Sequence, residues 1–457
     1  MAAARYGRRV AALEPYSIEY VPLAERHGRS RDLLWLWMAA NLTIADYALG
    51  FLPVSLGLPL APTLIALGAG NLLGGTLLAL CAAMGPRAGY PQMFIGRSAF
   101  GRIGGYGPAL LNWVSTAGWF TVNTILGAFA MQVLAPRLPF ALAAFALVAV
   151  QVLLVVYGHN LIHAFERVMA GLLGVLFLAS TLLVLGHGGQ LAAWHPVVAR
   201  GRLLPLVGIV LAAAFSYIAS WGPYASDYSR YLPQATPTAA LAWPVFLGAS
   251  IASFWLEVLG ALIAILAPGQ TNAVAALSHV LGAFGPIAVS SVILGAIAAN
   301  ALNLYSNTLS ARVLDVHWPR PVLAIVGGVL GLALALPGAG DFNGFYSDFL
   351  LLLDYWITPW LAVLLLDFYW RSTRQPGAFG DAPSWNASGI LAYLVGLAAS
   401  VPFMASTLFT GPLAGLFGGA DLSYFVGFAV AGAVYLGLTS RTRGHSTVDR
   451  GPTGTSG

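Results

Sequence analysis

Residues 37–51 read "WMAANLTIADYALGF", which places Asn41, Thr43 and Asp46 inside a long apolar segment. A carboxylate within a bilayer costs several kcal/mol unless it is paired, hydrated or protonated. A second apolar segment contains "FSYIASWGPYASDYSRY", residues 215–231, in which Gly222-Pro223 must break the ladder of helical hydrogen bonds. Broken helices are tolerated at membrane depth only where they are buried in protein or line a watery cavity. The two stretches therefore predict interrupted membrane helices; the alternative is a pair of proline kinks without a ligand.

The composition is that of a protein embedded in lipid. Hydrophobic residues make up 58% of the chain and charged residues 8%, with a mean hydropathy of +0.79, whereas soluble domains carry about 25% charged residues. A membrane helix needs roughly 20 apolar residues. Segments of that kind are expected at 33–55, 60–84, 106–134, 138–158, 166–187, 203–226, 238–267, 284–312, 319–338, 345–369, 387–409 and 414–438. They are too long and too apolar for transmembrane strands, so the sequence predicts an all-α polytopic membrane protein with twelve transmembrane helices.

The arginines predict how the chain is oriented in the membrane. All 21 basic residues are Arg, and with the N-terminus inside only Arg137, Arg200 and Arg202 fall in outer loops, leaving 21 − 3 = 18 on the inner side. The positive-inside rule then places both termini in the cytoplasm, and we expect a multi-pass protein of the plasma (inner) membrane. Because the arginines are dispersed over many loops, no nucleic-acid partner is expected. Cys81 is the single cysteine, so no intrachain disulfide can form.

The two interrupted segments are the first and the sixth, five spans apart. An odd offset gives them opposite orientations, as in an inverted five-plus-five repeat whose binding site lies at the midplane. The expected organisation is a cytoplasmic N-terminal segment at 1–32, a transporter domain at 33–438 and a disordered cytoplasmic tail at 439–457. Within the domain, repeat one covers about 33–187, repeat two about 203–369, and two extra helices 387–438.

Four charged residues are candidates for ion coupling and gating. Asp46 and Glu257 lie within apolar spans, where a proton or cation site and a structural hydrogen bond to a neighbouring helix are both open. Asp227 and Arg230 lie in the second half of span six, near its cytoplasmic end. They are candidates for an ion pair or gate, with ligand contact as the alternative for Asp227.

Aromatic and amide side chains are candidates for binding a ligand. Trp119 and Asn123 are four residues apart and share one helical face. Trp221 and Asn41 lie at the two predicted breaks, and Asn300 begins a polar stripe on span eight. Stacked indoles and amide edges suit a flat, neutral, polar heterocycle, although amides also hold membrane helices together.

Several ordered blocks carry a family resemblance: "WMAANLTIADYALGFLPVSLGL", "GWFTVNTILGA", "YGHNLIHAFERVM", "WGPYASDYSRYLP" and "ANALNLYSNTLSARVL". The chain resembles the purine–cytosine permease branch of the nucleobase–cation symporter-1 family. The resemblance implies the LeuT fold for the first ten helices and import of cytosine, purines or related heterocycles with sodium or protons. It also implies that Trp119 and Asn123 stack on and hydrogen-bond the base, that Trp221 is the aromatic of the broken sixth helix, and that Asn300 reads the base edge.

Two departures from the family pattern bear on the coupling ion. Asp46 stands where those permeases usually carry a small hydroxyl residue, so an acid replaces a neutral group at the first break. Ala298 and Ala299 lack the hydroxyls that a hard sodium ion would take from span eight. We therefore expect a proton rather than sodium, and no cofactor or bound metal.

The predicted function is a secondary-active symporter that works by alternating access around a midplane site. Its expected partners are a small nucleobase-like substrate, H⁺ or Na⁺, and the lipid bilayer. Another cargo on the same scaffold stays open: allantoin, a hydantoin, a thiamine-precursor pyrimidine or an amino acid. A membrane receptor without transport is the alternative from another class. An enzyme is not expected, because the sequence shows no metal ligands and no nucleophile with its base at membrane depth.

Overall fold

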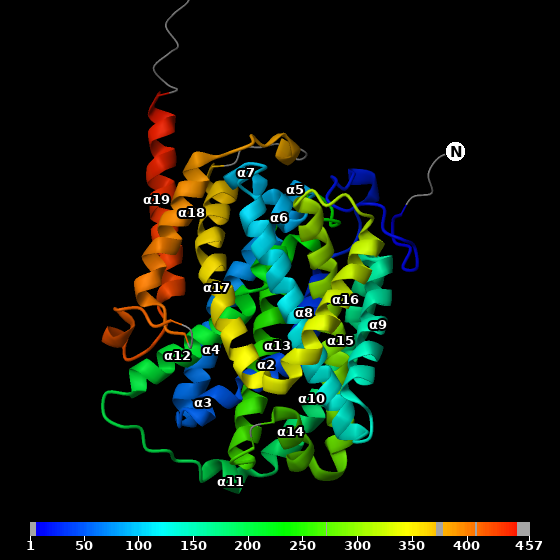
Figure 1. Cartoon of the computed structure of the whole chain (residues 1–457), viewed down its shortest axis with the longest axis vertical. Helices are drawn as coiled ribbons and strands as arrows, with labels where there is room; N and C mark the ends of the chain where they lie inside the picture. Colours follow the sequence, from blue (N-terminus) through cyan, green and yellow to red (C-terminus); the bar gives the residue numbers. More distant parts are fainter. Residues whose placement is uncertain (1–5, 271, 372–377, 407–408, 446–457) are drawn as a thin grey trace, which may run out of the picture.

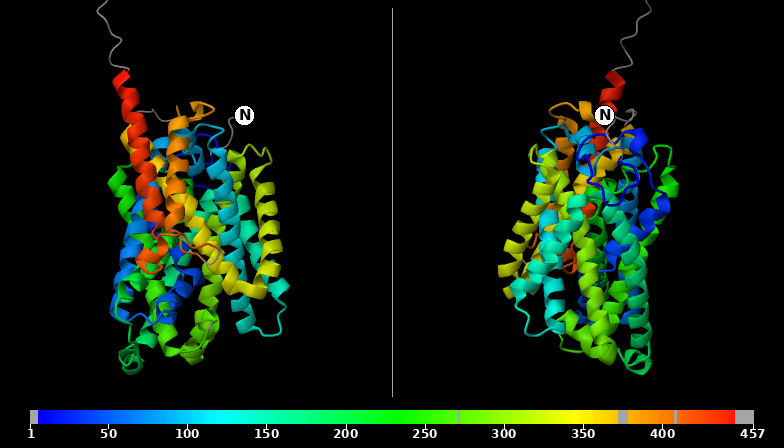
Figure 2. Two further views of the ribbon diagram at one scale, coloured as in Figure 1. Left: turned by 60° about the vertical axis from the view of Figure 1, so that its left-hand side comes forward. Right: turned by 90° about the vertical axis from the view of Figure 1, so that its right-hand side faces the viewer.

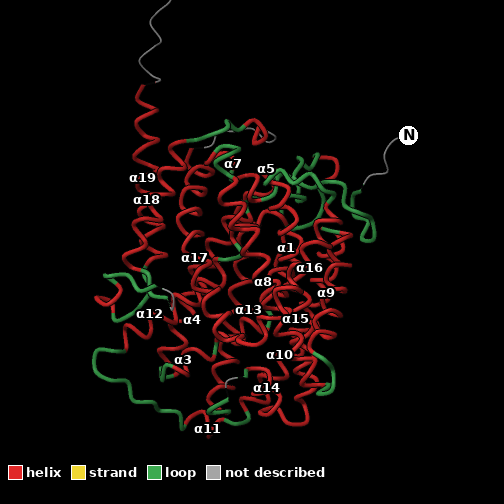
Figure 3. The backbone as a smooth tube through the Cα atoms, in the orientation of Figure 1, coloured by secondary structure: helices red, strands yellow, loops and turns green. Residues whose placement is uncertain are grey.

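The computed structural model describes residues 6–270, 272–371, 378–406 and 409–445 (Figure 3). Within these ranges the chain is helical, and the β-type pairing there is a single bridge between Ala405 and Thr410. Helices satisfy their own backbone hydrogen bonds, which lipid cannot do for them. The prediction of an all-α membrane protein is confirmed.

Long helices form the body of the molecule (Figure 1). They are α4 (Leu60–Ala82), α8 (Tyr106–Leu134), α9 (Phe140–Tyr157), α10 (His159–Leu185), α12 (Leu203–Ala219), α13 (Thr238–Leu266), α15 (Gly285–Val313), α16 (Arg320–Gly338), α17 (Phe342–Leu366), α18 (Ala387–Ser400) and α19 (Ser423–His445). Among the described residues, nine helical stretches are long and apolar enough to cross a membrane. The expected first span is divided into shorter helices and α18 has only 14 residues, so the number twelve stays a prediction.

Short helices mark the two ends of the bundle (Figure 1). α5 (Met84–Ala88), α6 (Gln92–Ile95) and α7 (Arg97–Phe100) lie at the same end as the first described residues; we call this the N-terminal end. α11 (Gly188–Ala192) and α14 (Ala273–Leu281) lie at the opposite end, which we call the far end.

Helix α19 leaves the bundle at the N-terminal end and projects beyond it (Figure 2). The predicted disordered tail began at residue 439, but α19 continues to His445. That boundary was wrong because hydropathy marks where a helix leaves the bilayer, not where its hydrogen bonding stops. Residues 446–457 of the predicted tail lie outside the described residues.

The chain leaves helical geometry within the first and the sixth predicted spans. α1 (Ser30–Asn41) is followed by Leu42 and by Thr43, which is extended at φ −123° and ψ 161°. α2 (Ile44–Leu49) then starts with the Thr43 hydroxyl accepting a bond from the Asp46 amide at 3.4 Å, and α3 (Phe51–Ser55) follows it. After α12 comes a 3₁₀ segment, η2 (Gly222–Asp227), in which Tyr224 departs from helical geometry at φ −139° and ψ 17°.

We call the first predicted span helix one; α1 is its first half, and α2 with α3 is its second half. Two glycines let the second half of helix one lie directly against α13. A Cβ added at Gly260 would come 1.9 Å from the carbonyl oxygen of Tyr47, and one added at Gly50 would come 2.0 Å from that of Glu257. Small residues allow such close approach of membrane helices. This crossing holds Asp46 on α2 beside the helix that carries Glu257.

Candidate substrate and ion site

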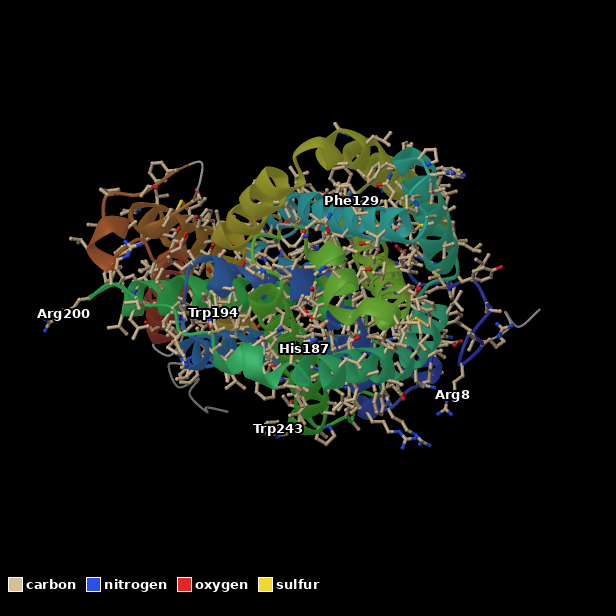
Figure 4. The ribbon with its side chains drawn as sticks, turned by 90° about the horizontal axis from the view of Figure 1, so that it is seen from below. Arg8, Phe129, His187, Trp194, Arg200 and Trp243 are labelled. Atoms are coloured by element: carbon tan, nitrogen blue, oxygen red, sulfur yellow. The ribbon has the colours of Figure 1, made fainter. Side chains whose placement is uncertain are left out.

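A cavity of about 1100 Å³ lies at the far end of the bundle. Residues of α2, α3, α8, α12 and α14 line it, together with Trp194 and Phe129, which Figure 4 labels in a view from that end. Its lining includes Ser216, next to Tyr217, and Leu126, which follows Asn123 by one helical turn on α8. The cavity therefore extends from the far end to within about one helical turn of Asn123.

Trp119 lies within an aromatic group at this level. Its indole packs edge-on against Tyr217, with ring centroids 5.4 Å apart, and against Phe349 at 5.3 Å. The Tyr217 hydroxyl is 2.9 Å from the Thr43 hydroxyl, so α12 joins Trp119 to the break in helix one. Asn123 donates its amide to the Trp119 carbonyl at 3.0 Å. Its Oδ1 is buried and accepts no hydrogen bond from the described residues, which leaves an acceptor for a ligand N–H.

Trp221 and Asn41 join the two breaks directly. The Trp221 indole donates to Asn41 Oδ1 at 3.1 Å, and the Ser253 hydroxyl of α13 donates to the same oxygen at 3.3 Å. Asn41 donates in turn to the Trp37 carbonyl at 2.7 Å. The predicted contact of Asn41 with substrate stays a prediction, since this amide ties α1 to the start of η2 and to α13.

Trp37 is a residue that the sequence reasoning missed. Its ring lies 5.5 Å from that of Trp221 and 5.8 Å from that of Tyr228, and the side chain is completely buried. Its indole N–H has no acceptor among the described residues. The spacing of Trp37 and Asn41, four residues on one helix, was the available signal.

The Asn300 amide is engaged in hydrogen bonds between helices. It donates to three acceptors on α8 and α9: Phe120 O at 2.9 Å, Thr124 Oγ1 at 3.1 Å and Gln151 Oε1 at 3.3 Å. Its role in reading a base edge stays a prediction, because those donors are engaged between helices. Asn303, one turn further, accepts a bond from the Tyr224 hydroxyl of η2 at 3.0 Å and is the α15 amide that contacts the second break.

Asp46 and Glu257 form a pair of completely buried acids that interact electrostatically. Glu257 accepts a hydrogen bond from Asn71 at one oxygen, whereas its other oxygen and both oxygens of Asp46 have none within the described chain. Besides Glu257, the Ser253 hydroxyl influences the Asp46 carboxyl electrostatically, but it lies outside hydrogen-bonding geometry. Two like charges that interact in a low-dielectric interior repel each other. The pair is therefore suited to hold a proton or a cation.

Arg230 forms an ion pair, but not with Asp227. Asp227 accepts a bond from the Gln92 backbone amide at 2.8 Å, while Arg230 lies 2.9 Å from Glu14. Proximity in sequence suggested the wrong partner, because the N-terminal segment folds back over this end of the bundle. The side chains of Arg230 and Glu14 are both completely buried.

Glu14 connects several helices at the N-terminal end. One of its oxygens also accepts from the hydroxyls of Tyr231 at 2.7 Å and Tyr305 at 2.9 Å, and the other accepts from the His159 amide at 3.0 Å. Arg320, at the start of α16, lies 3.8 Å from it. The site at the breaks is thus closed on this side by a buried network and faces a cavity on the other.

The interrupted helices, the cavity and the buried polar groups define a membrane transport protein. A family model described as "Permease for cytosine/purines, uracil, thiamine, allantoin" matches residues 20–427, and the chain belongs to this family. It is an integral, multi-pass membrane protein.

Relatives and solved structures agree with this assignment. The chain is 32% identical over 439 residues to YxlA of Bacillus subtilis, a protein named as a purine-cytosine permease, covering 93% of this chain and 95% of the relative. It is 26% identical to the purine-cytosine permease fcyB of Emericella nidulans, covering 93% and 88%. Among solved structures, Mhp1, a nucleobase-cation-symport-1 transporter in a closed conformation with bromovinylhydantoin bound, matches with a TM-score of 0.76, 20% identity and coverage of 95% and 96%. Its inward-facing conformation matches with a TM-score of 0.67. The fold expected from the family resemblance is confirmed.

Proposed function

We propose that this permease imports a nucleobase or a related flat heterocycle together with a proton, by alternating access. The N-terminal end faces the cytoplasm in this proposal, because 18 of the 21 arginines fall on the predicted inner side. The far-end cavity is then the outer vestibule.

The aromatic group supports a planar cargo. A ring that enters from the cavity meets Trp119, whose neighbours Tyr217 and Phe349 hold the indole edge-on. Stacking on an aromatic face discriminates little among bases. The buried Oδ1 of Asn123 supplies an acceptor for a ring N–H or an amino group.

The carboxyl of Asp46 carries the coupling proposal. It is completely buried at the break in helix one, and neither of its oxygens has a hydrogen-bond partner in the described part of the chain. The same break lies against α15 at Gly295, where an added Cβ would come 2.5 Å from the Leu42 carbonyl oxygen. The next turn of α15 offers Ala298 and Ala299, which provide no hydroxyl for sodium. A proton needs only the carboxyl.

Coupling follows if proton and cargo stabilise the same state. Protonation of Asp46 removes the repulsion with Glu257 and lets the two halves of helix one settle against α13. Cargo stacked on Trp119 favours the same arrangement of α8, α12 and helix one. Two ligands that bind one state better than another increase each other's affinity by the same factor. The occluded state then opens at the N-terminal end once the Glu14 network separates.

The test is transport in proteoliposomes under an imposed proton or sodium gradient, with radiolabelled cytosine, adenine, hypoxanthine, uracil and allantoin. The proposal predicts accumulation of at least one of these compounds under the proton gradient and its collapse when a protonophore is added. Accumulation that follows sodium alone contradicts the proton assignment. Absence of accumulation of all five under both gradients contradicts the function.

A further inference from the structure

Seven acidic side chains are buried in the described part of the chain, and their surroundings divide them into two groups. Five accept at least one hydrogen bond: Glu14, Asp227, Glu257, Asp367 and Asp421. The other two, Asp46 and Glu166, accept none at either oxygen. Asp46 is already placed at the helix break, whereas Glu166 has no part in the site described above.

Glu166 lies on the buried face of α10. Its exposed fraction is 0%, and the helix packs chiefly against α1 and α15, the two helices that meet at the first break. α10 runs from the N-terminal end, where the Glu14 network holds the amide of His159. Glu166 therefore lies in the half of α10 that is nearer the N-terminal end, about two turns from the start of the helix.

Neither carboxyl oxygen of Glu166 has a hydrogen-bond partner among the described residues. The charged groups on the helices around it are engaged elsewhere, except Arg31 of α1, which is exposed. Asp32 of α1 pairs with Arg167 at 3.1 Å, Arg312 of α15 pairs with Glu19 at 3.5 Å, and Glu257 of α13 pairs with Asn71. Tyr157 of α9, Tyr305 of α15 and His279 of α14 are the other titratable side chains on these helices; Tyr305 is bonded to Glu14.

A second cavity approaches Glu166 from the N-terminal end. It measures about 290 Å³, and its lining includes His159, His163 and Arg167 of α10 together with Tyr228. His163 precedes Glu166 by three residues and shares its helical face. The imidazoles of His159 and His163 lie 4.2 Å apart, each with Nε2 near the Tyr228 carbonyl, at 3.3 and 3.0 Å. One turn of α10 thus separates an isolated carboxyl from an imidazole-lined cavity.

We propose that Glu166 is a second proton-binding carboxyl of the transport cycle, through which protons leave toward the N-terminal end. An isolated carboxylate within the membrane is expensive, and buried polar groups without partners are rare enough to require a reason. In the state described here Glu166 holds its proton. When the N-terminal end opens, its O–H bond breaks, the proton passes to water in the imidazole-lined cavity, and the carboxylate is hydrated until the end closes again.

This inference rests on the proposed proton-coupled import, and the test separates the two. Glu166→Gln imitates the protonated acid but cannot release a proton. It is compared with wild type in proteoliposomes, using radiolabelled cytosine or adenine, whichever wild type accumulates. Exchange across the membrane at equal pH is measured beside net accumulation driven by a pH gradient. The initial uptake rate is also measured against lumenal pH at fixed external pH. Glu19→Gln, which removes a half-exposed carboxylate, is the control.

The expected result for Glu166→Gln is exchange within twofold of wild type, accumulation reduced at least tenfold, and an uptake rate that no longer rises as the lumen is made alkaline. The control behaves as wild type in all three assays. Accumulation equal to wild type overturns the role of Glu166 and leaves the proposed function intact. Loss of exchange together with accumulation also overturns it, because the side chain then supports the fold or the binding site. A wild-type protein that accumulates no probe under a pH gradient overturns the proposed coupling itself.

Discussion

Replacing Glu14 with Gln should open the N-terminal end. In the described state the side chains of Glu14 and Arg230 are fully buried, 2.9 Å apart. Removing one partner of such a pair costs about 3–5 kcal/mol, because the other charge stays buried without compensation. Arg230 keeps the Tyr305 hydroxyl at 3.0 Å and a backbone carbonyl, so the lower value applies here. The charge is hydrated once this end opens, and about 3 kcal/mol shifts the balance of closed to open states by roughly 100-fold.

The assay uses the chemistry of a single cysteine. Cys81 is the only native cysteine, so Cys81→Ala allows a reporter to be introduced as Ser306→Cys. Ser306 is completely buried on α15, 2.8 Å from the Tyr228 hydroxyl and next to Tyr305. The rate of maleimide labelling in detergent or nanodiscs then follows the open population, and Glu14→Gln should raise it by about two orders of magnitude.

Glu19→Gln is the matched control, since Glu19 pairs with Arg312 at 3.5 Å while 53% exposed. Exposed pairs contribute about 0–1 kcal/mol, so labelling should change less than about fivefold. Equal labelling rates for Glu14→Gln and Glu19→Gln would show that the Glu14 network does not hold this end closed.

Three further predictions concern the site and its support. Trp119→Ala should weaken binding of a labelled base, measured by scintillation proximity, by about 10- to 100-fold, since stacking on one aromatic ring contributes roughly 1–3 kcal/mol. Trp119→Phe should retain most of the affinity. Unchanged binding to the Ala variant would show that the base does not stack on Trp119. Asp46→Asn should preserve exchange while reducing gradient-driven accumulation at least about tenfold; equal effects in the two transport assays would remove its coupling role. Gly260→Ala should lower the apparent Tm, because its Cβ would lie 1.9 Å from the Tyr47 carbonyl oxygen and overpacking costs about 1–3 kcal/mol. Gly107→Ala, with open space around the added atom, should leave the Tm unchanged, and equal losses for both glycine variants would contradict the close crossing.

Features set by local chemistry could be predicted from the sequence. Pro223 has no N–H for the helical ladder, and the chain turns into a 3₁₀ segment there. The polar residues after Asn41 in an apolar run marked the first break. Four-residue spacing correctly put Trp119 and Asn123 on one face, where the amide of one donates to the carbonyl of the other.

Features set by the packing of distant segments could not be predicted. Spacing shows that Asn300 and Asn303 share a face of α15 but not which neighbour each contacts, and they turn out to bond α8 and η2, respectively. The partner of Arg230 is 216 residues away in the sequence. No pattern around Glu14 distinguishes it from other acids of the polar N-terminal segment. Its role appears only when that segment folds over the helix ends.

The most direct test of the account is the affinity for a labelled base as a function of pH, measured at equilibrium without a gradient. If cargo and proton favour the same state, binding to the wild-type protein weakens with rising pH by up to about tenfold per unit, and binding to Asp46→Asn stays constant over the same range. An affinity of the wild-type protein that does not change with pH, or an unaltered pH profile in Asp46→Asn, would contradict the account.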